Sequence, residues 1–244
     1  MKKKTLPILI SILIVVSIFG TIGIISAADT GWHSPGTIFN DDVIGNRPWM
    51  YIDDAKTSND EYARRAGLAA GGTSWILKST NFNMGVPSGA TIDGIYVQIE
   101  RDALGYPGVW DNLVRLVDHT GNYVGDNKAK SVAWSKTEGL FSYGDPWNLW
   151  SESWTVANIN DADFGVGLSV ILDLADGGDP HTALVDHIRI KVYYTEPSPS
   201  NFYINVGDSW QTATDIYVNV GDVWQDVEAV YVNVGDVWQQ IFSI

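Results

Sequence analysis

An eight-residue motif occurs three times at the C-terminal end of this chain, at a fixed spacing of 14 residues. The copies read Tyr-Ile-Asn-Val-Gly-Asp-Ser-Trp from residue 203, Tyr-Val-Asn-Val-Gly-Asp-Val-Trp from residue 217, and the same eight residues again from residue 231. Apolar and polar residues alternate on both sides of each Gly-Asp pair, and a two-residue loop with glycine first favours a type II′ turn. We therefore predict three tandem β-hairpins over residues 202–244. Because an isolated hairpin is marginally stable in water, similar copies favour stacking into a continuous sheet or small solenoid.

Three equal hairpins serve no catalytic chemistry, so the repetition indicates binding at several points or assembly. Stacked hairpins would align the repeated aromatic residues into two ladders. The ladders form either the core of the array, which we favour, or ligand sites between successive copies. We also expect that residues 202–244 join copies of the chain into a homo-oligomer.

The N-terminus is typical of an exported protein. Three lysines at residues 2–4 precede a stretch without charge that ends in Ser26, Ala27 and Ala28. A basic start, an apolar stretch and small residues at the end make residues 1–28 a secretory signal peptide. The alternative is an uncleaved anchor, since the stretch is about the ~20 residues that a membrane span needs. We expect cleavage before Asp29 and an extracellular or cell-surface location, with membrane contact only through this segment if it is retained.

The charge of the chain excludes one class of partner. The chain has 29 acidic and 15 basic residues, a net charge of −14, and no cysteine. An acidic protein repels the phosphates of nucleic acids, so we expect no nucleic-acid partner. Disulfide bonds are excluded as well, and the carboxylates are available to keep the protein soluble or to bind Ca²⁺.

The body of the chain, residues 29–195, predicts an all-β domain. It is followed by a linker at residues 196–201, where two prolines and two serines lie between strand-like segments. The clearest strands are predicted at residues 73–79, 90–101, 112–118, 164–172 and 183–194. Residues 60–70 form either a short helix or a loop. The domain is large enough for one antiparallel β-sandwich of jelly-roll type with a sizeable core.

Two of these strands have an alternation that specifies which residues are buried. In residues 90–101, a bulge at Gly94 would place the apolar residues on one face; these are Ile92, Ile95, Val97 and Ile99. In residues 183–194, one face would carry Leu184, Ile188, Ile190, Val192 and Tyr194, and the other His187, Arg189 and Lys191.

Several phrases resemble a β-sandwich domain that recurs in phage virion proteins and in secreted surface proteins of bacteria and archaea. They lie at residues 86–97, 145–155, 162–166 and 185–195, and the resemblance covers residues 32–195. The hairpins are similar to short aromatic repeats appended to such proteins. The resemblance implies a structural or binding module and transfers no functional residue, because the family has no agreed activity. His187 departs from the family pattern, which has an aromatic residue there.

We expect no enzymatic activity. The four histidines are scattered, and the chain has neither a zinc-binding His-Glu-x-x-His motif, nor a Gly-x-Ser-x-Gly elbow, nor a cysteine nucleophile. Glycosidases need two carboxylates about 5–10 Å apart, but no pair stands out among the 29 acids. An exported hydrolase is therefore the least favoured class.

A calcium site is predicted in the loop between the last two strands of the body. This loop carries Asp173, Asp176 and Asp179 among glycines. Ca²⁺ takes six to eight oxygen ligands, which carboxylates and free carbonyls of such a loop supply. A second group of acids lies at residues 40–42, 53–54 and 59–61. Neither group has EF-hand spacing, and the alternative for both is that Asp and Gly only form turns.

Four aromatic residues on glycine- and proline-containing loops are candidate ligand-binding residues. They are Tyr106 and Trp110 in one loop, and Tyr143 and Trp147 in another. Such rings can stack on sugars while nearby Asp and Asn accept hydroxyl hydrogens. Alternatively, three tryptophans fill the open edge of the sandwich: Trp147, Trp150 and Trp154. We favour this interpretation for them because they lie in the recurring family phrase at residues 145–155. For Tyr106 and Trp110, both interpretations stay open.

These observations favour a secreted, non-enzymatic surface protein whose sandwich binds a glycan or another surface component. The alternative is a structural or assembly subunit of a cell-surface or virion particle, with the hairpins mediating oligomerisation.

Overall fold

The computed structural model of the chain describes residues 27–66, 72–105, 108–172 and 181–196, together with the six strands of the C-terminal tail. The chain forms two compact units, one of which spans Ile25–Pro197. The described strands are paired in antiparallel sheets, and the helical segments are a 3₁₀ turn, η1 (Ile52–Ala55), and one short helix, α1 (Val156–Asn160). The all-β prediction is confirmed.

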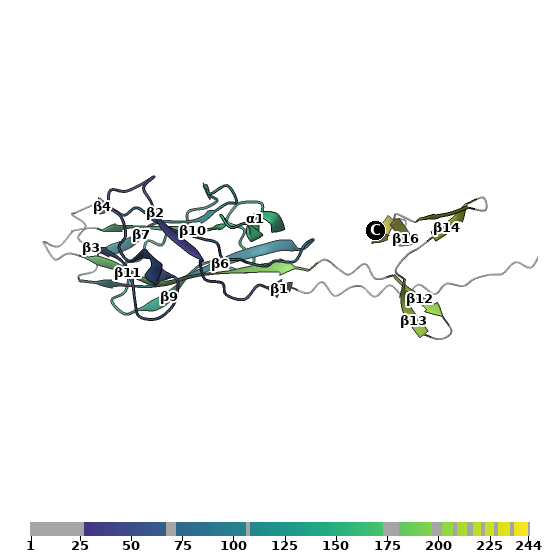
Figure 1. The fold of residues 1–244 in the computed structure, drawn as a ribbon, viewed down its shortest axis with the longest axis horizontal. Helices are drawn as coiled ribbons and strands as arrows, with labels where there is room; N and C mark the ends of the chain where they lie inside the picture. The colour runs from purple at the N-terminus through teal and green to yellow at the C-terminus, as the bar shows by residue number, and fades with distance from the viewer. Residues whose placement is uncertain are drawn as a thin grey trace, which may run out of the picture. The chain divides into compact units, whose positions relative to one another are not determined.

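The unit Ile25–Pro197 contains two sheets that lie as two layers (Figure 1). The β6 sheet has the order β1–β11–β6–β9, with β3 also paired to β11. Its strands are β1 (Ala27–Asp29), β3 (Ala63–Ala66), β6 (Thr91–Leu104), β9 (Gly139–Gly144) and β11 (Thr182–Thr195). The β10 sheet has the order β2–β5–β10–β7–β8, with β4 also paired to β10. Its strands are β2 (Thr37–Asp41), β4 (Gly72–Thr73), β5 (Ile76–Thr80), β7 (Val109–Val117), β8 (Tyr123–Val124) and β10 (Gly165–Leu172).

The core lies between the two sheets. Fully buried aliphatic residues come from both layers and include Ile95, Ile99, Leu116, Val166, Leu168, Ile188 and Ile190. Each such side chain contributes roughly 1.5–3 kcal/mol relative to full exposure. The alternation along the strands therefore fixes which face of each sheet is buried.

A bulge in β6 confirms the predicted irregularity at Gly94. Gly94 is opposite Tyr193 while Ile92 is opposite Tyr194, so Asp93 is an extra residue that has no opposite residue in the β11 register. The bulge changes the phase of the alternation, and Ile92 is therefore buried together with the apolar residues that follow it.

A second bulge, in β11, corrects the prediction for Leu184. Val185 is opposite Arg101 and His187 is opposite Glu100, so Asp186 is the extra residue. The alternation shifts by one position at this point, and Ala183 and Val185 belong to the core cluster while Leu184 does not. The sequence pattern placed Leu184 on the wrong face because this bulge carries no glycine to mark it.

The segment considered for a helix at residues 60–70 contains a strand instead. Residues 63–66 form β3, which pairs with β11 from Ala63 opposite Val185 to Ala66 opposite Thr182. Ala63 is fully buried in the core. Pairing with an already formed sheet therefore outweighs the helical propensity of this alanine- and arginine-rich segment.

The tail contains three pairs of antiparallel strands. They are β12 (Phe202–Val206) with β13 (Ser209–Ala213), β14 (Tyr217–Val220) with β15 (Val223–Asp226), and β16 (Ala229–Val234) with β17 (Val237–Ser243). Among the described strands, these six pair only within their own hairpin. Each hairpin therefore has two open edges in this part of the chain.

Within the described residues, we find no helix with the length and apolar character needed to cross a bilayer. The predicted signal segment lies outside the described residues apart from Ala27 and Ala28, which are paired with Thr195 and Tyr194 of β11.

Candidate ligand-binding groove

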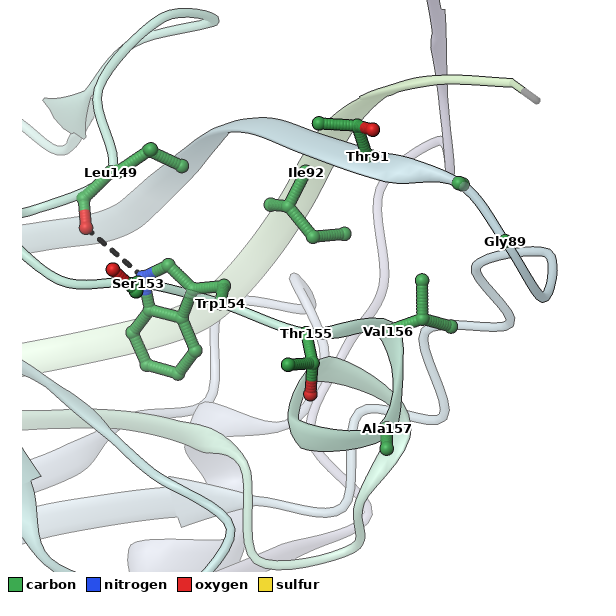
Figure 2. Close-up of a pocket in the computed structure, with 10 residues that line it drawn as sticks. Gly89, Thr91, Ile92, Leu149, Ser153, Trp154, Thr155, Val156 and Ala157 are labelled. Atoms are coloured by element: carbon green, nitrogen blue, oxygen red, sulfur yellow. Dashed lines mark hydrogen bonds between the residues drawn. The ribbon is translucent and has the colours of Figure 1, made fainter. Parts of the chain in front are cut away.

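A groove lies where β6 begins, beside the loop that leads into α1. It has a volume of about 590 Å³, within the roughly 300–1,000 Å³ range of small-ligand sites. Figure 2 shows its two walls, one from β6 and one from the loop and the first turn of α1. The lining combines apolar side chains with three hydroxyl groups; its residues are 89–92, Leu149 and 153–157.

Side-chain hydrogen bonds fix the backbone of the loop at residues 145–150, which precedes the groove-lining residues 153–157. The Asp145 carboxylate accepts a hydrogen bond from the Trp147 amide at 2.8 Å, and the Asn148 side chain accepts one from the Trp150 amide at 2.9 Å. Short Asx turns of this kind replace strand pairing for a tight loop. Trp150 is fully buried, and its indole Nε1 donates to the Ile95 carbonyl at 2.9 Å. The loop is therefore tied to β6 at the level of the groove.

Trp154 forms one wall of the groove. Its indole Nε1 donates to the Leu149 carbonyl at 3.0 Å, the bond drawn in Figure 2, and its ring packs edge-on against Phe164 with 5.4 Å between centroids. Thr155 then caps α1: its hydroxyl accepts from the Asn158 amide, while the Asn158 side chain accepts from the Thr155 amide. This reciprocal cap holds the first turn of the helix against the groove.

A smaller cavity of about 110 Å³ shares Ser153 and Trp154 with the groove. Its other residues are polar apart from Val124 and include Asp118, His119, Glu152 and Asn158. The side-chain Nδ2 of Asn158 donates to Nδ1 of His119 at 2.8 Å, and the Glu152 carboxylate accepts from the Gly125 backbone amide at 3.0 Å. Burial acts to raise the pKa of Asp118, but hydrogen bonds from Thr120 and Asn122 outweigh it and lower this pKa. Trp154 thus lines both the mainly apolar groove and the smaller acidic cavity.

The structure places the predicted ligand-binding residues in different environments. Tyr106 lies outside the described residues. Trp110 is in β7, not in a loop, and is half-buried opposite Ile171 of β10. Trp147 lies in the turn that precedes the groove and is 75% exposed, so it does not fill a gap in the sandwich, whereas Trp150 is fully buried.

The prediction that Tyr143 lies in an open loop is wrong, and the exposed ring on which its predicted role in ligand binding depended is absent. Tyr143 is in β9, opposite Val97 of β6, and is 2% exposed. Its hydroxyl donates to the Asp111 carboxylate at 2.9 Å. The ring is part of the core, because strand pairing with β6 turns it inward.

The predicted calcium ligands Asp173, Asp176 and Asp179 lie outside the described residues. Within the described residues, a different acidic group can hold a metal ion, formed by Asp60, Glu138 and Asp186. Sequence reasoning noticed Asp60 in the acidic segment at residues 59–61, but it missed Glu138 and Asp186. The three residues are far apart in sequence and share no motif, so only their spatial arrangement reveals them.

We compared the chain with models of protein families, with curated proteins and with solved structures, and no match was found in any of the three.

Proposed function

We propose that this chain is an extracellular, non-enzymatic protein whose sandwich, of jelly-roll type, binds a neutral glycan through the groove beside Trp154. The observation that carries the proposal is that one indole ring borders both cavities. The apolar face of a sugar ring packs well on an indole, and the hydroxyl groups of Thr91 and Ser153 in the groove lining match the hydroxyl groups of a sugar.

The charge of the site favours a neutral ligand. Asp118 and Glu152 border the smaller cavity, and the whole chain carries a net charge of −14. An anionic sugar would meet a repulsive potential at this end of the sandwich. The export part of the proposal is supported by the sequence of residues 1–28.

The groove can be tested by filling it. Ala157 is exposed on α1 and lines the groove, so Ala157→Arg places a long side chain in the cavity without removing packing. Ala162 is also exposed but is outside the groove lining, and Ala162→Arg is the matched control. On an array of neutral and acidic oligosaccharides, we expect the full chain and the control to retain neutral glycans, and Ala157→Arg to lose them. Equal retention by the two variants would contradict the proposal.

The open edges of the hairpins favour a second candidate function, assembly of copies through residues 202–244. Unpaired strand edges are templates for pairing with another chain, and the described tail strands pair only within each hairpin. Stacking of the three repeats remains a prediction. Light scattering after size-exclusion chromatography tests this function: we expect the full chain to form a defined oligomer that is lost when residues 198–244 are deleted. A monomeric full chain, or an oligomer with the same number of copies after the deletion, would contradict this function.

A further inference from the structure

Three carboxylates converge on the outer face of the β6 sheet, at the end of β6 away from the groove. One oxygen from each of Asp60, Glu138 and Asp186 lies within 4.8 Å of the other two. Asp186 is 1% exposed, Glu138 is half-buried and Asp60 is exposed, so the group extends from the surface into the protein.

Strand register explains why these residues meet. Asp186 is the bulged residue of β11, on one side of β6. Glu138 directly precedes β9, whose first residue, Gly139, is opposite Arg101 on the other side of β6. Because their oxygens still lie within 4.8 Å, the two side chains reach toward each other over β6.

The loop before β3 brings in the third carboxylate. The Asn59 amide donates to both oxygens of Asp186, at 3.1 and 3.2 Å. The Asn59 side chain accepts from the Glu61 amide at 3.2 Å, which turns the chain tightly at Asp60. These bonds hold the Asp60 carboxylate beside that of Asp186.

Asp102 provides an independent indication that a cation belongs here. It lies on β6 between Glu138 and β11, and it faces away from the core because its neighbour Ala103 belongs to the core cluster. The residue is 8% exposed, and among the described residues its buried Oδ1 has no hydrogen-bond partner. A buried carboxylate oxygen without a partner is costly and calls for a compensating positive charge.

The electrostatics of the group agree with its geometry. Burial, and next the charge of Asp186, raise the pKa values of both Asp102 and Glu138. Burial likewise raises the pKa of Asp186, against the hydrogen bonds from Asn59 and Asp60. Burial is thus the main cause that disfavours the charged form of each of these carboxylates.

We propose that Asp60, Glu138 and Asp186, with Asp102 beneath them, form a Ca²⁺ site. Two oxygens bound to one Ca²⁺ at about 2.4 Å lie at most about 4.8 Å apart, which matches the observed group. Ca²⁺ accepts six to eight oxygens in flexible geometry, whereas Mg²⁺ binds at about 2.0–2.1 Å and requires a near-ideal octahedron, so carboxylates contributed by three separate segments favour Ca²⁺. The site stands independently of the groove and of the glycan proposal.

Calorimetric titration of the full chain with CaCl₂ tests the site, with MgCl₂ as the competing ion. We expect Ca²⁺ affinity to fall more than tenfold in Glu138→Gln and in Asp186→Asn, and to stay within twofold in Glu61→Gln, an exposed acid beside the site. Asp176→Asn, in the loop at residues 173–179, should also leave it unchanged. Loss of binding in Asp176→Asn but not in Glu138→Gln would overturn the proposal, as would the absence of Ca²⁺ binding or a preference for Mg²⁺.

A second readout covers the case in which Asp186→Asn fails to fold. In chelator, Glu138→Gln removes one of the repelling charges, so its melting temperature should exceed that of the unaltered chain. With about 2 mM Ca²⁺, in the range of weak extracellular sites, the order should reverse. If Ca²⁺ shifts both melting temperatures equally, Glu138 is not a ligand and the assignment is wrong.

Discussion

Arg101 and Asp111 form an ion pair inside the sandwich, with 3.7 Å between the closest nitrogen and oxygen and both side chains at least 98% buried. The Asp111 carboxylate also accepts from Trp134 Nε1 at 2.8 Å and from the Tyr143 hydroxyl at 2.9 Å. The Arg101 guanidinium lies over the ring of Phe141 at 3.9 Å. One carboxylate therefore satisfies groups from three parts of the chain.

We expect Asp111→Asn to destabilise the protein by roughly 3–5 kcal/mol, because it leaves the Arg101 charge buried without a counter-charge. Urea denaturation followed by tryptophan fluorescence measures this. Asp53→Asn is the control, since Asp53 pairs with Lys56 at the surface, where its side chain is 74% exposed. Exposed pairs of this kind often contribute nothing measurable. Similar loss in both variants would mean that the buried pair has no special role.

Trp147 and Trp150 lie three residues apart but should respond in opposite ways to truncation. Trp150 is fully buried and bonded to Ile95, so Trp150→Ala should cost about 3–5 kcal/mol. Trp147 is 75% exposed, and Trp147→Ala should change stability by less than about 0.5 kcal/mol. Thermal unfolding of the two variants distinguishes them. A large loss in Trp147→Ala would show that its ring packs against the protein.

Gly94 is required because the loop at residues 145–146 packs directly on it. A Cβ at Gly94 would lie 2.2 Å from the Pro146 carbonyl oxygen. We expect Gly94→Ala to cost roughly 1–3 kcal/mol through a backbone shift. At Gly139, also in the β6 sheet, the nearest atom to a new Cβ is Cε2 of Phe141 at 3.7 Å, an ordinary contact. Gly139→Ala should therefore leave the midpoint of urea denaturation nearly unchanged, and an equal loss at both positions would refute the steric argument.

The acidic group predicts a pH dependence in the absence of cations. The pKa values of Asp102, Glu138 and Asp186 are raised, chiefly by burial, so the native state binds more protons than the unfolded state above about pH 4. Stability contributed by these groups is therefore lost as the pH rises through their folded pKa values. In chelator, Glu138→Gln should stabilise the chain more at pH 7 than at pH 5.

His187 also makes the stability depend on pH, so the effect of the carboxylates has to be measured as a difference between the unaltered chain and Glu138→Gln. Burial, and next the charge of Arg189, lower its pKa, so its contribution to stability is lost as the pH falls below about 6.5. That effect opposes the effect of the carboxylates but is common to the unaltered chain and Glu138→Gln. The difference in melting temperature between the two, measured from pH 5 to 7, isolates the carboxylate. A difference that is constant with pH would contradict the raised pKa of Glu138.

The sequence alone determined the class of the fold and much of the core. Alternation identified β6 and β11, and a glycine marked the bulge that buries Ile92 together with Ile95. These are local properties, since side chains on a strand alternate between faces whatever the strand's partner. The alternation failed at Leu184, where the bulge at Asp186 depends on pairing with β6 and leaves no mark in the residues themselves.

Tertiary structure decided which polar and aromatic residues meet. The residues around Tyr143 are typical of a loop, but the pairing of Tyr143 with Val97 places its ring in the core. Asp60, Glu138 and Asp186 come from three distant segments, and the register of β9 and β11 on either side of β6 brought their oxygens together. Periodicity is encoded residue by residue, whereas register arises from contacts between segments far apart in the chain. The sandwich could therefore be predicted from the sequence, but its groove and its acidic site could not.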